Sequence, residues 1–85
     1  MESEDEDTIF FVFYKSLYED IYHFIKNQTD NESKILLKKL EKLIVRSHVI
    51  IDIVLFNEIK SYFEDRQSNN NASEIYDELI KIELT

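Results

Sequence analysis

Hydrophobic side chains recur three and four positions apart along most of this chain. That spacing places them on one face of an α-helix. The chain also contains no glycine and no proline, so the residues that tight β-hairpin turns usually need are missing. We therefore predict an all-α fold, a small bundle of three to four helices near residues 8–26, 31–46, 48–67 and 72–83.

The boundary between the two middle helices carries no helix-breaking residue. A single helix over residues 31–67 would be about 55 Å long, which is too long for a compact bundle of this size. We therefore expect a bend or short break near residues 46–49, with one continuous helix as the alternative. The run VIIDIVLF (49–56) is β-branched and would suit a strand, but it has no evident partner strand, so a helix is preferred.

Residues 9–25 carry more apolar surface than one face of a helix can bury. As a helix, this segment presents a phenylalanine-rich stripe suited to a dry core, namely Phe10, Phe13, Leu17, Ile21 and Phe24. The adjacent stripe is rich in tyrosine and consists of Phe11, Tyr14, Tyr18, Tyr22 and Ile25. Tyrosine is enriched in protein interfaces, so the second stripe is a candidate docking surface.

The segment 49–56 is apolar almost all round as a helix, which requires cover from the rest of a bundle or from another chain. We therefore expect a protein partner or a homodimer. The predicted protein interface consists of Phe11, Tyr14, Tyr18, Tyr22, Ile50 and Val54.

Acidic residues dominate the charge of the chain. The formal net charge is −8, and residues 1–7 read MESEDED, which we predict to be an acidic flexible tail before a single helical domain over 8–85. The tail lacks the basic residues of a signal peptide, and no apolar run is long enough to span a bilayer. We expect a cytoplasmic protein without a membrane partner, whose negative field favours a partner with a basic surface.

The residues do not form a recognisable catalytic pattern. There is no cysteine, and no glycine shapes an oxyanion loop. Two histidine–carboxylate pairs have helical spacing, Asp20 with His23 and His48 with Asp52, but a di-metal bundle would need further such elements. We therefore predict no enzyme activity, no cofactor and no metal.

The remaining hypotheses are protein binding, self-assembly and nucleic-acid binding. The first is a small acidic protein-binding module, such as an inhibitor, antitoxin, immunity protein or host antagonist of the kind phages, viruses and mobile elements encode. The second is a homo-oligomeric structural or scaffolding protein. The third is a nucleic-acid-binding regulator that uses the basic side of the second helix, although the acidic surroundings oppose it; that side carries Lys34, Lys38, Lys42 and Arg46.

Overall fold

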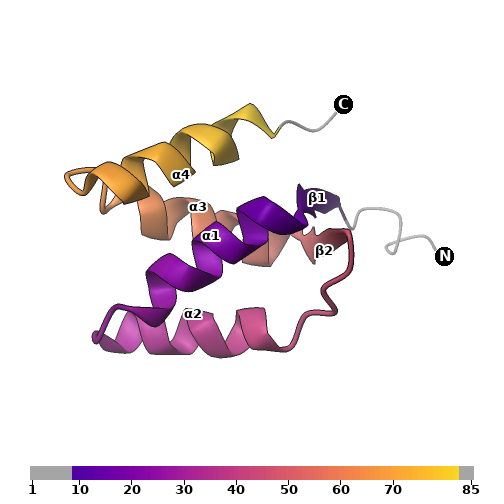
Figure 1. The fold of residues 1–85 in the computed structure, drawn as a ribbon, viewed down its shortest axis with the longest axis horizontal. Helices are drawn as coiled ribbons and strands as arrows, with labels where there is room; N and C mark the ends of the chain where they lie inside the picture. The colour runs from indigo at the N-terminus through magenta and orange to yellow at the C-terminus, as the bar shows by residue number, and fades with distance from the viewer. Residues whose placement is uncertain (1–8, 83–85) are drawn as a thin grey trace, which may run out of the picture.

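Four helices and a two-stranded antiparallel sheet make up the part of the chain that the computed structural model describes, residues 9–82. Their order is β1 (Phe10–Tyr14), α1 (Lys15–Lys26), α2 (Asn31–Glu41), β2 (His48–Asp52), α3 (Ile53–Glu64) and α4 (Asn70–Lys81) (Figure 1). The fold is thus a small helical one, as predicted, but not purely α-helical. The predicted acidic tail, residues 1–7, lies outside the described part.

The two strands correct the sequence prediction in both places where helix was preferred. Residues 10–14 were expected to begin the first helix, and residues 48–52 to begin the third. In the structure they pair with each other, with Val12 opposite Ile50. Both segments are rich in β-branched or aromatic residues, which suit a pleated surface, and each supplies the partner that the other lacked.

Burial alternates along both strands, as it does in a sheet with one face on the core. Phe11, Phe13, Val49 and Ile51 point inward. The expected helical stripes had placed Phe10 in the core and Phe11 at an interface. In the strand Phe10 is exposed and Phe11 is buried, because side chains alternate with a period of 2 residues in a strand and repeat every 3.6 residues in a helix.

The helices are shorter than predicted at several ends. The second ends at Glu41 rather than near residue 46, and β2 separates it from α3, so the middle helices are not continuous. Side-chain caps fix three helix starts: Asp30 accepts from Ser33 N, Asp52 from Leu55 N and Asn69 from Ala72 N. The sequence predicts the starts of α2 and α4 correctly to within two residues.

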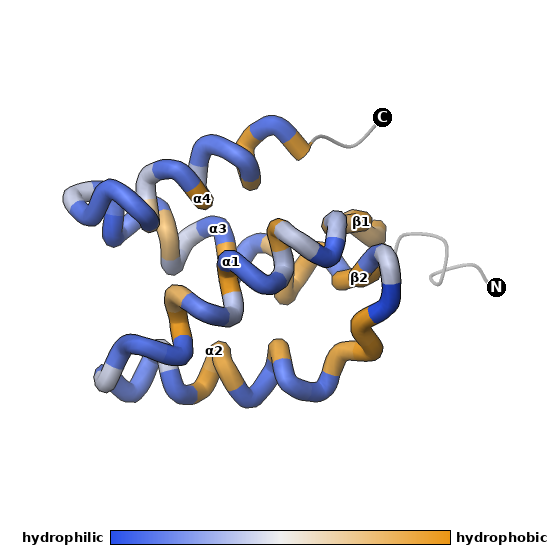
Figure 2. The backbone as a smooth tube through the Cα atoms, in the orientation of Figure 1, coloured by the Kyte–Doolittle hydropathy of each residue, from blue (hydrophilic) through white to orange (hydrophobic). Residues whose placement is uncertain are grey.

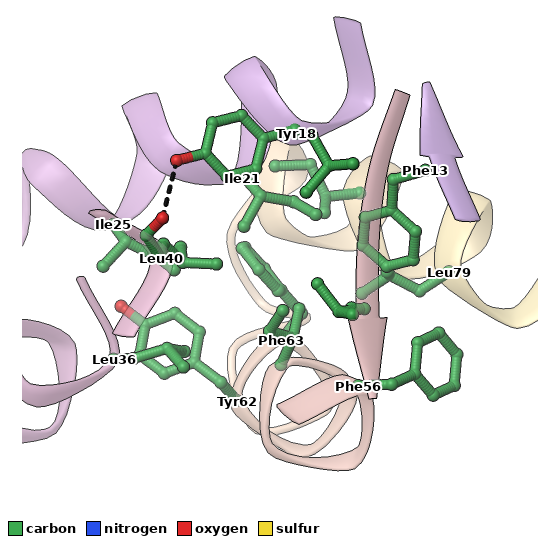
Figure 3. Close-up of a cluster of buried hydrophobic side chains, with 14 of the residues drawn as sticks. Phe13, Tyr18, Ile21, Ile25, Leu36, Leu40, Phe56, Tyr62, Phe63 and Leu79 are labelled. Atoms are coloured by element: carbon green, nitrogen blue, oxygen red, sulfur yellow. Dashed lines mark hydrogen bonds between the residues drawn. The ribbon is translucent and has the colours of Figure 1, made fainter. Parts of the chain in front are cut away.

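The core lies where α1, α2, α3, α4 and the inner face of the sheet meet (Figure 3). Phe63 is fully buried there and its ring contacts those of Phe24 and Tyr62. Tyr18 reaches across from α1, and its hydroxyl donates a 2.9 Å hydrogen bond to the backbone oxygen of Leu40. The same carbonyl, in the last turn of α2, also accepts from Leu43 N at 3.1 Å, so the tyrosine hydroxyl is its second donor and joins α1 to the end of α2.

A polar cluster lies at the other end of α2, around buried Ser33. Its hydroxyl is hydrogen-bonded to Tyr62 and donates to Asp30 Oδ1 at 2.7 Å. Arg66 donates to Asp30 Oδ2 at 2.9 Å and lies over the Tyr62 ring, 3.7 Å from its centroid. The cluster therefore connects the start of α2 to the end of α3. The buried Ser33 hydroxyl has hydrogen-bond partners within it, as buried polar groups usually do.

Candidate protein-binding surfaces

Half of the exposed large hydrophobic side chains within residues 9–82 lie on the outer face of the two-stranded sheet. Four large side chains stand on it together: Phe10 is 56 % exposed, Val12 54 %, Tyr14 70 % and Ile50 60 %. Figure 2 shows the hydrophobic residues of both strands side by side. We call this surface the outer sheet face and include His48 and Asp52, which complete it.

The strand register separates the two ionisable groups of the outer sheet face. His48 lies opposite Tyr14 at one end, with ring centroids 5.4 Å apart, and Asp52 lies opposite Phe10 at the other end. Asp52 Oδ1 accepts a 2.8 Å hydrogen bond from Leu55 N, so this carboxylate is held in place as the cap of α3. An uncharged centre of Val12 and Ile50 lies between the two ends.

A second surface is a groove of about 1080 Å³ between α1 and α4, which pack on each other. Its lining includes partly or fully buried apolar side chains, Phe13, Leu17, Phe24, Ile75 and Ile82, and also the exposed Val12 and Tyr14 of the outer sheet face. Its exposed acidic lining comes from Asp20, Glu74, Asp77 and Glu78. We call it the acidic groove.

Negative charge prevails along the acidic groove. Lys81 is the single lysine among its lining residues, and its Nζ lies 3.4 Å from a carboxylate oxygen of Glu78. His23 also lines the groove, and its Nδ1 is 3.2 Å from Asn27 Nδ2. The groove therefore offers apolar contact at its base and three carboxylates beyond the Lys81–Glu78 pair.

The six residues predicted as an interface do not form one surface. Phe11 and Tyr18 belong to the core, at 9 % and 8 % exposure. Burial, with the neighbouring Tyr22 and Glu41, raises the pKa of the Tyr18 hydroxyl above its ordinary value. Tyr22 is half-buried and donates to Glu41 at 3.2 Å.

The other three predicted residues are exposed, but on two surfaces. Tyr14 and Ile50 meet on the outer sheet face, although they come from segments far apart in the sequence. Val54, at the start of α3, lies apart from them beside Ile35 in a shallow depression between α2 and α3. The expected helical stripe of tyrosines is formed only in part: the rings of Tyr18 and Tyr22 stack on α1 with centroids 6.1 Å apart, but Tyr14 precedes the helix and Tyr18 is buried.

The predicted interface missed four residues of the outer sheet face, Phe10, Val12, His48 and Asp52, and all of the acidic groove. The signal for the first was the segment FFVFY itself, whose apolar residues fit a strand with one face exposed. For the groove, Asp20 and Asp77 carry no shared sequence signal, because only the packing of α1 on α4 brings their helices together.

The basic line of the second predicted helix is shorter than expected. Lys34 and Lys38 lie on α2, but the helix ends before Lys42 and Arg46. Lys39 on the same helix makes an ion pair with Glu58 of α3 at 2.7 Å. A continuous cationic helix face over four residues is therefore not formed.

Within residues 9–82 the structure contains no cluster of three or more histidine and carboxylate side chains that could hold a metal ion. No helix in that range is long and apolar enough to cross a membrane. Comparisons with protein-family models, curated proteins and solved structures gave no match. The two surfaces and the charge of the chain are therefore the features of this protein that bear on its function.

Proposed function

We propose that this protein is a small acidic, non-enzymatic protein-binding module. It acts as an inhibitor, antitoxin, immunity protein or host antagonist of a phage, virus or mobile element, and it takes a basic segment of its partner into the acidic groove. The observation that carries the proposal is the combination, in one groove, of an apolar base with an acidic border.

An amphipathic helix with basic residues beside its apolar stripe matches this combination. Its apolar side chains would contact Leu17, Phe24 and Ile82, which are only partly buried. Its lysine or arginine side chains would face Asp20 and Asp77 across the groove. Binding would then combine burial of apolar surface with charge pairing at the border.

The net charge of the chain supports the same kind of partner. A formal charge of −8 on 85 residues produces a negative field that attracts cationic surfaces from a distance. Such steering increases the rate of association more than it increases affinity, and it falls as ionic strength rises. Rapid capture of a basic target suits a protein whose role is to neutralise another protein.

An amphipathic helical peptide of leucine and lysine tests this proposal as a probe, measured by calorimetric titration. The paired substitution Asp20→Lys with Asp77→Lys should weaken binding by about tenfold or more, because it reverses charges on both sides of the groove. The control pair, Glu19→Lys with Glu64→Lys, changes the net charge equally at exposed positions outside the groove. It should have a much smaller effect.

Equal weakening by both pairs would contradict the proposal, because binding would then follow net charge alone. The same peptide with glutamate in place of lysine should not bind. Capture from lysate with the wild-type protein and with both paired variants would extend the test to natural partners, which should be lost only with the groove variant.

A homo-oligomeric structural role is the second candidate, and the outer sheet face favours it. Four large apolar side chains are exposed together on one small sheet, and a contiguous exposed apolar patch often marks a protein–protein contact. Nucleic-acid binding has less support, because α2 ends before Lys42 and Arg46.

A further inference from the structure

We infer that a second copy of this chain covers the outer sheet face, related to the first by a two-fold axis that lies between the two sheets and perpendicular to their strands. The outer sheet face shares Val12 and Tyr14 with the lining of the acidic groove, but His48 and Ile50 belong to the sheet face alone, so substitutions there test this inference separately from the groove proposal. It follows from the order of side chains on the two strands.

The chemistry of the outer sheet face is arranged in three rows across the strands. Phe10 is paired with Asp52 in the first row and Val12 with Ile50 in the second. Tyr14 is paired with His48 in the third. All the aromatic residues of this face that come from β1 are thus at its two ends, and the acid and the imidazole are at opposite ends of β2.

A two-fold axis perpendicular to the strands stacks each strand on the same strand of the partner and reverses its direction, so that opposite ends of the two copies meet. Val12 then meets the partner's Val12, and Ile50 meets the partner's Ile50. Phe10 meets the partner's Tyr14, so ring lies on ring at both ends. Asp52 meets the partner's His48, and symmetry repeats this pair at the other end.

The alternative axis, parallel to the strands, gives a poorer match. It stacks β1 on the β2 of the partner and brings the same ends of the two sheets together, so Phe10 would lie against the partner's Asp52. Val12 would lie against the partner's Ile50, which is equally favourable, but each carboxylate would be covered by a phenyl ring without a polar partner. Desolvating a carboxylate in this way is costly, so the register itself selects the perpendicular axis.

The local hydrogen bonds prepare His48 and Asp52 for this contact. His48 Nδ1 lies 3.1 Å from the Ser47 hydroxyl, and when that hydroxyl donates, the ring hydrogen is on Nε2. Nε2–H can then donate to a carboxylate. Asp52 uses Oδ1 to accept from Leu55 N, and its second oxygen, Oδ2, can accept from the imidazole.

The expected dimer is weak and concentration-dependent. The face comprises six side chains on two five-residue strands. A standard stable interface buries roughly 800 Å² on each partner, from about 20–30 residues, so this one is much smaller. Sedimentation velocity over micromolar to millimolar protein concentrations is therefore the appropriate measurement. A wild-type chain that stays monomeric throughout this range would overturn the inference.

Substitutions on β2 test the face and the axis separately. Ile50→Lys brings two like charges together at the centre and should abolish the dimer. His48→Asp places a carboxylate against the partner's Asp52 twice and should weaken it by about tenfold or more, whereas His48→Lys should preserve it. None of these positions lines the acidic groove.

The matched controls are the same changes at exposed positions elsewhere, Ile44→Lys in the connection after α2 and His23→Asp on α1. Both should leave the dimer unchanged, and circular dichroism checks that every variant is folded. A dimer that survives Ile50→Lys would show that another surface associates. A dimer that Ile50→Lys dissociates but His48→Asp does not weaken would overturn the proposed axis.

Discussion

The ring of Phe11 lies flat on the ring of Phe56, with centroids 3.9 Å apart and planes 7° from parallel. This contact joins β1 to the first turns of α3, and Phe13 meets the same ring edge-on at 6.0 Å. Two strand residues thus share one helical partner. This aromatic group, together with buried Val49 and Ile51, packs the inner face of the sheet on the core.

Truncation of Phe11 should therefore be much more costly than truncation of its neighbour. We expect Phe11→Ala to lower the free energy of unfolding by about 3–5 kcal/mol, because it removes a buried ring and leaves a cavity beside Phe56. Phe10→Ala, on the exposed side of the same strand, serves as the control and should cost less than about 1 kcal/mol. Urea denaturation measures both, and equal losses would contradict the strand assignment of residues 10–14.

The Tyr18 hydroxyl should contribute to stability through its bond to Leu40. Tyr18→Phe keeps the ring but leaves the backbone oxygen of Leu40 without this donor, at a cost of about 1–2 kcal/mol. Tyr14→Phe removes an exposed hydroxyl and should change little. Thermal unfolding followed by circular dichroism would distinguish the two, and no loss with Tyr18→Phe would mean that water replaces the bond.

Asp52 should stabilise α3 as its N-cap. Asp52→Ala removes the acceptor of the Leu55 N–H and should cost about 1 kcal/mol. Asp52→Asn retains an oxygen at the same position and should recover most of that loss. Chemical denaturation of both variants checks the assignment, which would be wrong if the two substitutions were equally destabilising.

Asp30 should make stability depend on acid pH. The Ser33 hydroxyl, which donates to Asp30, lowers the pKa of that carboxyl below its ordinary value of 3.8, and the Ser33 N–H and Arg66 act in the same direction. Because the folded pKa is below the unfolded one, this stabilisation is present above about pH 3.8 and is lost as the pH falls through the lowered pKa.

Carbon-13 NMR titration of the Asp30 carboxyl measures this shift directly. Ser33→Ala removes the hydroxyl donor and should move the pKa of Asp30 back toward its ordinary value. An Asp30 carboxyl that titrates at or above 3.8 in the wild-type protein would contradict the role of the polar cluster.

Helix content was predictable from the sequence because apolar spacing and polar connections are local signals. The start of α2 illustrates this, since its capping residue Asp30 lies in a polar run directly before an apolar stripe. The sheet was not predictable in the same way. Phe10–Tyr14 and His48–Asp52 are separated by more than thirty residues, and each becomes a strand only because the other is present.

The errors in the predicted interface have the same cause, namely that the two strands were predicted as helices. Tyr14 and Ile50 were selected correctly as exposed side chains, but the helical period placed Phe11 and Tyr18 with them and left Phe10 and Val12 out. The acidic groove depends on how α1 packs against α4, which composition and periodicity do not determine. Long-range packing therefore accounts for what sequence reasoning missed.

Each strand leads into a helix without an intervening loop, β1 into α1 and β2 into α3, and Lys15 N donates to Ser47 O at the first of these junctions. Inserting one residue into either strand would therefore do more than exchange its two faces. It would also turn the attached helix by about 100° and carry its buried stripe away from the interior. Changes in chain length during evolution should consequently be confined to the connections, such as residues 42–47 and 65–69, which can absorb them without rotating a helix.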